Sequence, residues 1–175
     1  MRDPTPAKRT GRGTPRALLD DMTEHILIPI DFSETAEAAA EYGCALAVRL
    51  GARVTLLNAY SAEIVATPDA VFAPTEEERI ALRQAALEHL QSIAAKLEEP
   101  GLAIHCVAAE GMPGDTILGY AEREHADLIV MGTHGRRGFS RLLLGSVAEH
   151  LVRLAPCPVL TVGRNTRLAE HAVAS

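Results

Sequence analysis

Aromatic residues and lysines are scarce in this chain. Its 175 residues include no tryptophan, three tyrosines, three phenylalanines and only two lysines. The core must therefore come from aliphatic side chains, which fits an apolar content of 47%. Acidic residues outnumber basic ones by 23 to 17, which gives a net charge of −6. This balance argues against the large basic face that non-specific nucleic-acid binding requires, so we expect no nucleic-acid partner.

Long apolar runs are also absent. None approaches the roughly 18 residues that a membrane-spanning helix needs, and the first 24 residues lack the apolar stretch of a signal peptide. Cys44, Cys106 and Cys157 are an odd number of cysteines without CxxC or CxH spacing. Buried thiols in a reducing compartment are the simplest interpretation, and a disulfide or a zinc site is the alternative. We therefore expect a cytoplasmic protein without membrane contacts.

A length of 175 residues suits one domain with a flexible segment at each end. Residues 1–22 contain three prolines and two glycines that break any periodicity, which predicts a flexible N-terminal arm. A role for this arm in binding a partner is the alternative. Residues 164–175 are expected to form a flexible C-terminal tail, and residues 23–163 the folded domain.

Within the domain, strand-like and helix-like segments alternate. Strands are expected at 25–30, 54–59, 102–108, 127–131 and 158–162, and helices at 34–50, 76–98, 113–125 and 146–154. The strands are largely apolar rather than strictly alternating, which predicts an α/β fold with a five-stranded parallel sheet and helices on both faces. Ligands of such sheets bind at the carboxyl ends of the strands, so the residues that follow each strand are the candidates for function.

The fourth expected strand leads into a glycine-containing loop that precedes the last helix. Gly132, Gly135 and Gly145 would allow backbone N–H groups to approach an anion, and the helix N-terminus adds partial positive charge. Further positive charge would come from Arg136, Arg137 and Arg141, and a hydroxyl from Ser146. A phosphate-binding loop is one interpretation. Ordinary turn glycines are the other.

Two common nucleotide-binding motifs are excluded by position. A Walker loop requires GxxxxGK[ST], but the two lysines, Lys8 and Lys96, lie in no such context. A Rossmann dinucleotide site requires GxGxxG after the first strand, where this chain has PIDFSE.

Three side chains near these motifs have competing interpretations. Ser146 and Glu149 have the spacing of a capping box, so Ser146 would either cap its helix or contact phosphate. Asp31 would either stabilise the first helix, with Ser33 as its N-cap, or accept hydrogen bonds from ribose hydroxyls. His134 is interpreted as a loop residue rather than a catalytic base.

The combination of motifs resembles the universal stress protein family. The loop matches G-x2-G-x9-G-[ST] through Gly132, Gly135, Gly145 and Ser146, and the first strand ends in PIDFSE. The peptides ADLIVMGTHG and LLLGSVAE strengthen the match, which spans about residues 24–163. The N-terminal arm and Ala59, where the family often has valine, depart from the pattern.

The resemblance implies a Rossmann-like sandwich, similar to the adenine nucleotide alpha hydrolases, with strand order 3-2-1-4-5. It further implies that ATP, or AMP or ADP, binds at the carboxyl edge, and that the chain forms a homodimer through its last strand at 158–162. Mg²⁺ would enter with the nucleotide through phosphate oxygens and Ser146, because no second carboxylate completes a dedicated site. The residues that would contact the nucleotide are Pro29, Ile30, Asp31, Ala59, Met131, Gly132, Gly135, Arg136, Gly145, Ser146 and Val147.

These inferences predict an ATP-binding regulatory protein of the stress response. A slow ATPase or phosphotransferase is one alternative, although the sequence supplies no clear base to activate water beside the γ-phosphate. A dimeric interaction module with a vestigial nucleotide pocket is the other alternative, and the intact glycines weigh against it.

Overall fold

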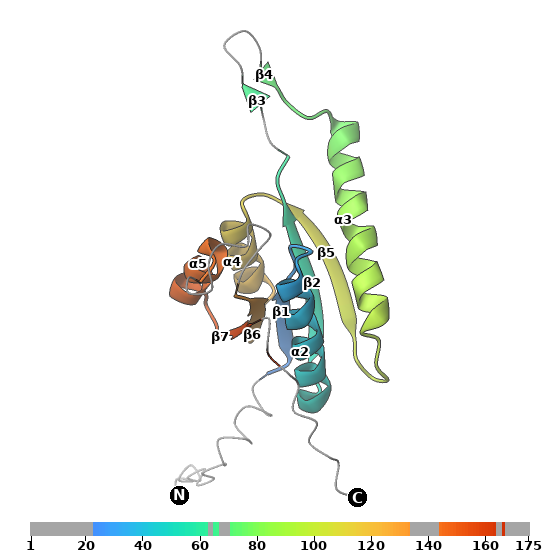
Figure 1. Cartoon of the computed structure of the whole chain (residues 1–175), viewed down its shortest axis with the longest axis vertical. Helices are drawn as coiled ribbons and strands as arrows, with labels where there is room; N and C mark the ends of the chain where they lie inside the picture. The colour runs from blue at the N-terminus through green and yellow to red at the C-terminus, as the bar shows by residue number, and fades with distance from the viewer. Residues whose placement is uncertain (1–22, 63–64, 67–70, 134–143, 164–165, 167–175) are drawn as a thin grey trace, which may run out of the picture.

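The computed structural model of the chain describes residues 23–62, 65–66, 71–133, 144–163 and 166. The arm expected at 1–22 and the tail expected at 164–175, apart from Thr166, lie outside these residues. The described part folds as a five-stranded parallel sheet between two layers of helices (Figure 1).

The sheet has the order β5-β2-β1-β6-β7, and all four strand pairs are parallel. Its strands are β1 (His25–Pro29), β2 (Arg53–Tyr60), β5 (Ile104–Glu110), β6 (Leu128–Gly132) and β7 (Val159–Val162). In chain order this is 3-2-1-4-5, so the implied topology is confirmed. The helices are α2 (Glu34–Leu50), α3 (Glu76–Lys96), α4 (Pro113–Arg123) and α5 (Ser146–Leu154).

Alternating side chains of the sheet build two separate cores. Ile26 and Ile28 of β1 pack beneath α2 and α3, whereas Leu27 packs beneath α4 and α5. The small residues of α2 allow close helix–sheet contact, because a Cβ atom at Gly43 would lie 2.5 Å from the Ile28 side chain. The described part therefore has two helices on each face of the sheet, as the alternation of elements predicts.

Helix α2 has the predicted bounds because both of its ends carry clear signals. The Ser33 side chain accepts a hydrogen bond from the Ala36 N–H at the N-terminus, and Gly51 closes the C-terminus in the left-handed conformation with φ 68°.

The predicted end of α4 at residue 125 is wrong. His125 adopts φ 51°, and the N–H of Ala126 bonds back to the carbonyl of Ala121, so the helix ends at Arg123.

Three further differences concern the end of α3, the bounds of β5 and the connection between β2 and α3. Helix α3 ends at Lys96 instead of residue 98. Strand β5 runs two residues later than predicted because its pairing with β2 extends to Tyr60 opposite Glu110. The connection between β2 and α3 is not only a loop, since β3 (Val65–Ala66) and β4 (Val71–Phe72) pair antiparallel beyond the first turn of α3 (Figure 1). Two-residue strands leave no periodicity that a sequence could reveal.

All three cysteines are free thiols. Cys44 is buried in the core under α2, and its burial raises the pKa of the thiol to about 11. Among the described residues, no group of His, Cys, Asp and Glu side chains is arranged to hold a metal ion. No helix in this part of the chain is long and apolar enough to cross a membrane.

Candidate functional site at the carboxyl edge of the sheet

The candidate site lies where the strand order reverses. From β1 the chain continues to β2 on one side, whereas β6 and β7 lie on the other side of β1. Two segments therefore follow neighbouring strands at the carboxyl edge: residues 30–33 after β1, and Gly132 with Thr133 at the end of β6. Such a reversal opens a crevice between the two connections, which is the usual ligand position in this architecture.

Backbone hydrogen bonds bring the two ends of the glycine loop together. Thr133 donates its N–H to the Val162 carbonyl at 3.0 Å, and the N–H of Gly145 donates to the Thr133 carbonyl at 2.9 Å. Gly132 and Gly145 are thus neighbours in space although 13 positions separate them in the chain. The loop between them, with His134, Gly135, Arg136, Arg137 and Arg141, lies outside the described residues.

Helix α5 begins without a side-chain cap. Gly145 is its N-cap residue, with φ −60° and ψ 150°, and no side chain accepts a hydrogen bond there. The capping-box interpretation of Ser146 is therefore wrong: this residue is the first of the helix, and its side chain is exposed. The first helical hydrogen bond runs from the Glu149 N–H to the Gly145 carbonyl at 2.8 Å. The preceding N–H groups are left to face an incoming anion.

The Glu149 carboxylate is directed along the helix. Its Oε1 lies 3.9 Å from Nη1 of Arg153, one turn further from the N-terminus. This exposed pair contributes little to stability, but it places part of the negative charge away from the candidate anion site.

Close packing against α2 requires a glycine at position 132. A Cβ atom there would lie 2.9 Å from the backbone carbon and oxygen of Thr35, and 3.1 Å from the Ala36 nitrogen. The end of β6 therefore rests directly on the first turn of α2. This contact connects the glycine loop to the segment that carries Asp31.

The Asp31 carboxylate organises the start of α2. Its Oδ1 accepts hydrogen bonds from the Ser33 N–H at 3.1 Å and from the Ser33 hydroxyl at 2.6 Å, while Ser33 Oγ accepts from the Ala36 N–H at 3.3 Å. The Ser33 cap is thus confirmed, with Asp31 supporting it. The half-buried carboxylate lies at the carboxyl edge of the sheet.

The residue between them has an unusual backbone conformation. Phe32 adopts φ 62°, a left-handed conformation that costs a non-glycine residue roughly 1–2 kcal/mol. Its ring stacks on the imidazole of His89 on α3, with centroids 4.1 Å apart and planes 2° from parallel. Behind the loop, the amide of buried Asn58 donates a hydrogen bond to the Ile30 carbonyl at 2.7 Å. Sequence reasoning missed these three residues, and only Asn58, a polar residue within an apolar strand, left a signal.

The remaining predicted residues lie at or next to the carboxyl ends of β1, β2 and β6. Pro29 and Ile30 are buried at the end of β1, and Met131 is buried in the core beneath α4 and α5. Ala59 is half-buried at the end of β2, opposite Ala109 of β5. The side chains of Ile30 and Met131 are committed to the core, so these residues would meet a ligand mainly through their backbone.

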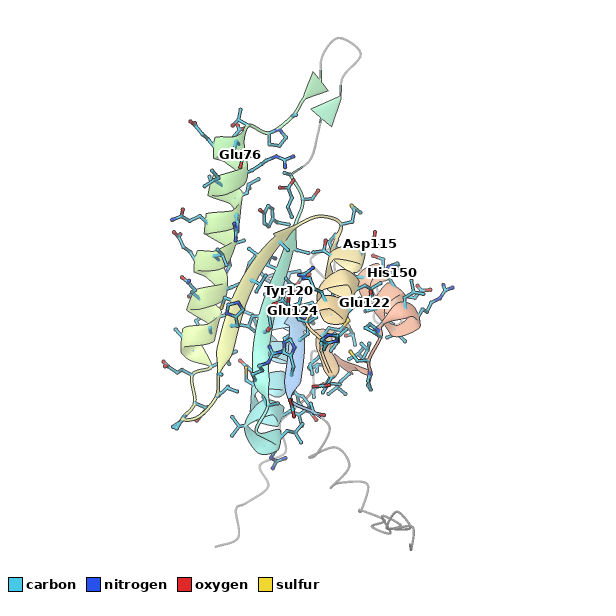
Figure 2. All side chains as sticks on the ribbon, turned by 180° about the vertical axis from the view of Figure 1, so that it is seen from behind. Glu76, Asp115, Tyr120, Glu122, Glu124 and His150 are labelled. Carbon is cyan, nitrogen blue, oxygen red and sulfur yellow. The ribbon has the colours of Figure 1, made fainter. Side chains whose placement is uncertain are left out.

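A histidine–aspartate pair joins the two helices on this face. Nε2 of His150 on α5 lies 3.2 Å from Oδ1 of Asp115 in the first turn of α4, and Figure 2 shows the two side chains next to each other. The His150 ring packs against Gly114, where a Cβ atom would lie only 2.7 Å from Cδ2 of the ring. The pair supports the packing of α5 against α4, and the sequence carried no signal for it.

Comparison with known proteins agrees with this geometry. The sequence model of the universal stress protein family matches residues 22–163. The chain belongs to this family. Universal stress protein MJ0531 of Methanocaldococcus jannaschii is 37% identical over 147 residues, which cover 82% of this chain and 84% of that protein. The identification made from the motifs is confirmed.

Solved structures of the family share the fold. The structure of MJ0577 from the same archaeon matches with a TM-score of 0.67 at 30% identity, covering 83% of this chain and 99% of that one. A family member from Arabidopsis thaliana, solved with AMP bound, matches with a TM-score of 0.52 at 22% identity, covering 82% of this chain and 93% of that one. At this identity the second match speaks for the fold alone.

Proposed function

We propose that this universal stress protein binds ATP at the carboxyl edge between β1 and β6, and that nucleotide occupancy controls its conformation or its partners in the stress response. One observation carries the proposal: a chain of contacts links the uncapped N-terminus of α5, through Thr133 and Gly132, to the Asp31 carboxylate. Groups able to donate hydrogen bonds to an anion, and a carboxylate able to accept them from a ribose, would then lie on either side of one crevice.

The residues divide between the parts of the nucleotide. Asp31 would accept hydrogen bonds from the ribose hydroxyls, and the backbone of Ala59 would meet adenine beside Pro29 and Ile30. The phosphates would be held by the loop and by the first residues of α5: Gly132, Gly135, Arg136, Gly145, Ser146 and Val147. The Arabidopsis protein was solved with AMP bound, but the assignment of an adenine nucleotide to the present chain rests on these residues and not on that match.

The donor set around α5 suits a nucleotide that arrives with Mg²⁺. Magnesium usually keeps several waters and binds through substrate phosphates and one or two protein oxygens. The exposed Ser146 hydroxyl is one such oxygen. The ion would thus be held mainly by the phosphates, and its charge would reduce repulsion between them.

A homodimer is the second part of the proposal. Strand β7 is at the end of the strand order and pairs only with β6 in the described part of the chain. Val152 and Leu154, on the α5 segment that leads toward β7, are 53% and 59% exposed. An unpaired apolar edge next to exposed aliphatic side chains favours pairing with a second copy. With three free thiols, the dimer would operate in a reducing compartment such as the cytoplasm.

The test of nucleotide binding uses the purified protein. We expect heat-denatured protein to release ATP, ADP or AMP, and nucleotide-free protein to bind MgATP in calorimetry. Gly119→Ala serves as a control, since a side chain there meets nothing within 4 Å. Absence of both released nucleotide and a binding signal would contradict the proposal and favour a dimeric module with a vestigial pocket.

A further inference from the structure

The conformation of Phe32 determines where Asp31 points. Phe32 lies between Asp31 and Ser33, and the two Asp31–Ser33 hydrogen bonds span it. In the structure these bonds form with Phe32 at a φ of 62°. If Phe32 relaxed to an ordinary negative φ, the chain direction would change between the carboxylate and the helix cap. The loop that presents Asp31 therefore depends on a conformation that a phenylalanine backbone does not favour by itself.

His89 is positioned to maintain that conformation. The parallel stack, 4.1 Å between ring centroids, fixes the Phe32 side chain against α3, while the rest of the ring packs on the core beneath α2 and α3. His89 is otherwise exposed, and its ring makes no hydrogen bond to any described residue. The stack on Phe32 is thus the specific contact through which the His89 ring can act. A strained backbone conformation usually persists only where surrounding contacts hold the residue in it.

We propose that His89 is a positioning residue for the nucleotide, acting through its stack on Phe32 to hold Asp31 in the orientation that accepts the ribose hydroxyls. This inference rests on the proposed nucleotide function. It makes α3, whose sequence carries no binding motif, part of the machinery that presents the ribose acceptor. His89 does not touch the ligand, and the phosphate-binding end of the site on α5 does not depend on it.

The first experiment compares MgATP with inorganic tripolyphosphate in calorimetry. His89→Ala removes the stack and should weaken MgATP binding by about 5- to 30-fold. This factor corresponds to the free-energy cost of the left-handed conformation of Phe32, which the stack offsets. Tripolyphosphate, which has no ribose, should bind equally well to wild type and variant. His89→Phe retains a flat ring and should restore MgATP affinity to within about 2-fold. The exposed residue His105 on β5 provides the control variant His105→Ala.

The second experiment separates the stack from any direct effect of His89. Glycine adopts φ 62° without strain, so in a Phe32→Gly background the additional change His89→Ala should have no further effect on MgATP affinity. A penalty that persists in this background would show that His89 acts independently of Phe32 and would overturn the proposal. Unchanged MgATP affinity in the single variant His89→Ala, or an equal loss for tripolyphosphate, would overturn it as well.

If the wild-type protein binds no nucleotide, the proposed function is refuted. Hydrogen exchange then still tests whether His89 positions the loop. The Ser33 amide donates to Asp31 and reports the loop directly. By NMR it should exchange at least about 5-fold faster in His89→Ala than in wild type, and return to the wild-type rate in His89→Phe. An exchange rate that does not change in His89→Ala would contradict the positioning role whatever the ligand.

Discussion

At the scale of single residues, glycines at and near the carboxyl edge differ in what a side chain would meet. At Gly132 a Cβ atom would press on the backbone of Thr35, whereas at Gly119 it would meet nothing within 4 Å. Gly145 has φ −60° and ψ 150°, a conformation open to every residue. Gly132 is therefore needed for packing and Gly119 is not, while the backbone conformation of Gly145 is one that other residues also adopt.

Gly132→Ala should lower the free energy of unfolding by about 1–3 kcal/mol, because backbone atoms cannot move aside as a flexible side chain would. The matched change Gly119→Ala, in the exposed interior of α4, should instead raise stability by up to about 1 kcal/mol through helix propensity. Urea denaturation of both variants checks the pair. Equal stabilities would mean that β6 does not approach α2 as closely as described.

Gly145→Val should weaken MgATP binding without unfolding the protein. The branched side chain would stand between the first amides of α5 and the phosphates, and the loss of one charge-assisted hydrogen bond costs roughly 1.5–3 kcal/mol, or about 10- to 150-fold in affinity. Calorimetry measures the change, with Gly119→Ala as the reference. A valine variant that bound MgATP as tightly as wild type would disprove the phosphate assignment of this loop.

A buried histidine at the amino-terminal end of β1 predicts that the stability of the fold decreases in acid. His25 on β1 is 1% exposed, and Nε2 lies 2.8 Å from the Thr55 hydroxyl. Burial and the nearby Arg53 charge lower the pKa of His25 below its usual value of 6.5, although the Glu124 carbonyl and the Asp127 and Glu124 carboxylates oppose the shift. The unfolded chain then binds a proton more readily than the folded one, so this stability is complete above about pH 6.5 and is lost as the pH falls below it.

The free energy of unfolding should therefore decrease between pH 7 and pH 5, with His25 contributing at most about 1.4 kcal/mol per pH unit. His25→Gln removes the titrating group and should flatten this part of the curve, while the exposed residue His105 provides the control variant His105→Gln. Denaturant titrations at several pH values provide the data. An identical slope in His25→Gln would assign the acid sensitivity to other groups.

At the scale of elements, the two edges of the sheet differ. At the β5 edge, the long helix α3 packs against β5 and β2. At the other edge, β7 is short, and its first three residues are half-buried. Leu160 is half-buried and packs against the core beneath α2 and α3, so it tolerates a longer side chain better than Val162, which is 2% exposed and would disrupt the core if changed. The dimer proposal is therefore tested best at Leu160.

Leu160→Lys should weaken the homodimer at least about 10-fold, because a lysine between two paired edges would lose its hydration without gaining a partner. Ile80→Lys on α3, an exposed position near the opposite edge, should leave the assembly unchanged. Light scattering at micromolar concentration distinguishes the two species. A wild-type monomer under these conditions, or a Leu160→Lys protein that dimerises normally, would refute pairing through β7.

At the scale of the whole molecule, we expect nucleotide binding with little or no turnover. The groups proposed to surround the phosphates, backbone amides, arginines and Ser146, stabilise negative charge but do not activate water. His150 is held by Asp115 between α4 and α5, and His134 lies outside the described residues. A nucleotide retained without a nucleophile acts as a ligand whose occupancy can shift a conformational equilibrium.

Single-turnover measurements with excess protein, ATP and Mg²⁺ should therefore give hydrolysis well below about 1 s⁻¹, the low end of ordinary enzymes. His134→Ala should not change that rate. Hydrolysis at or above about 1 s⁻¹ would replace the switch interpretation with an enzymatic one. Its disappearance in His134→Ala would then identify His134 as catalytic.

The amino-acid sequence by itself determined the order of the four helices and the five strands of the main sheet, the parallel sheet and the family. These features depend on local signals that need no distant partner, such as the Ser33 cap and the Gly51 stop of α2, which gave this helix its correct bounds. The strand order came from the family resemblance, and the glycine spacing of the loop carried that resemblance.

Only the tertiary structure decided how the candidate site is held together. The contact of Gly132 with α2, the support of Ile30 by Asn58 and the stack of Phe32 on His89 each join elements that are distant in the chain. Strand β5 likewise took its bounds from pairing with β2. Sequence patterns record which side of a helix or strand is apolar. They do not record which residues of another element will face it, because that depends on how the elements pack.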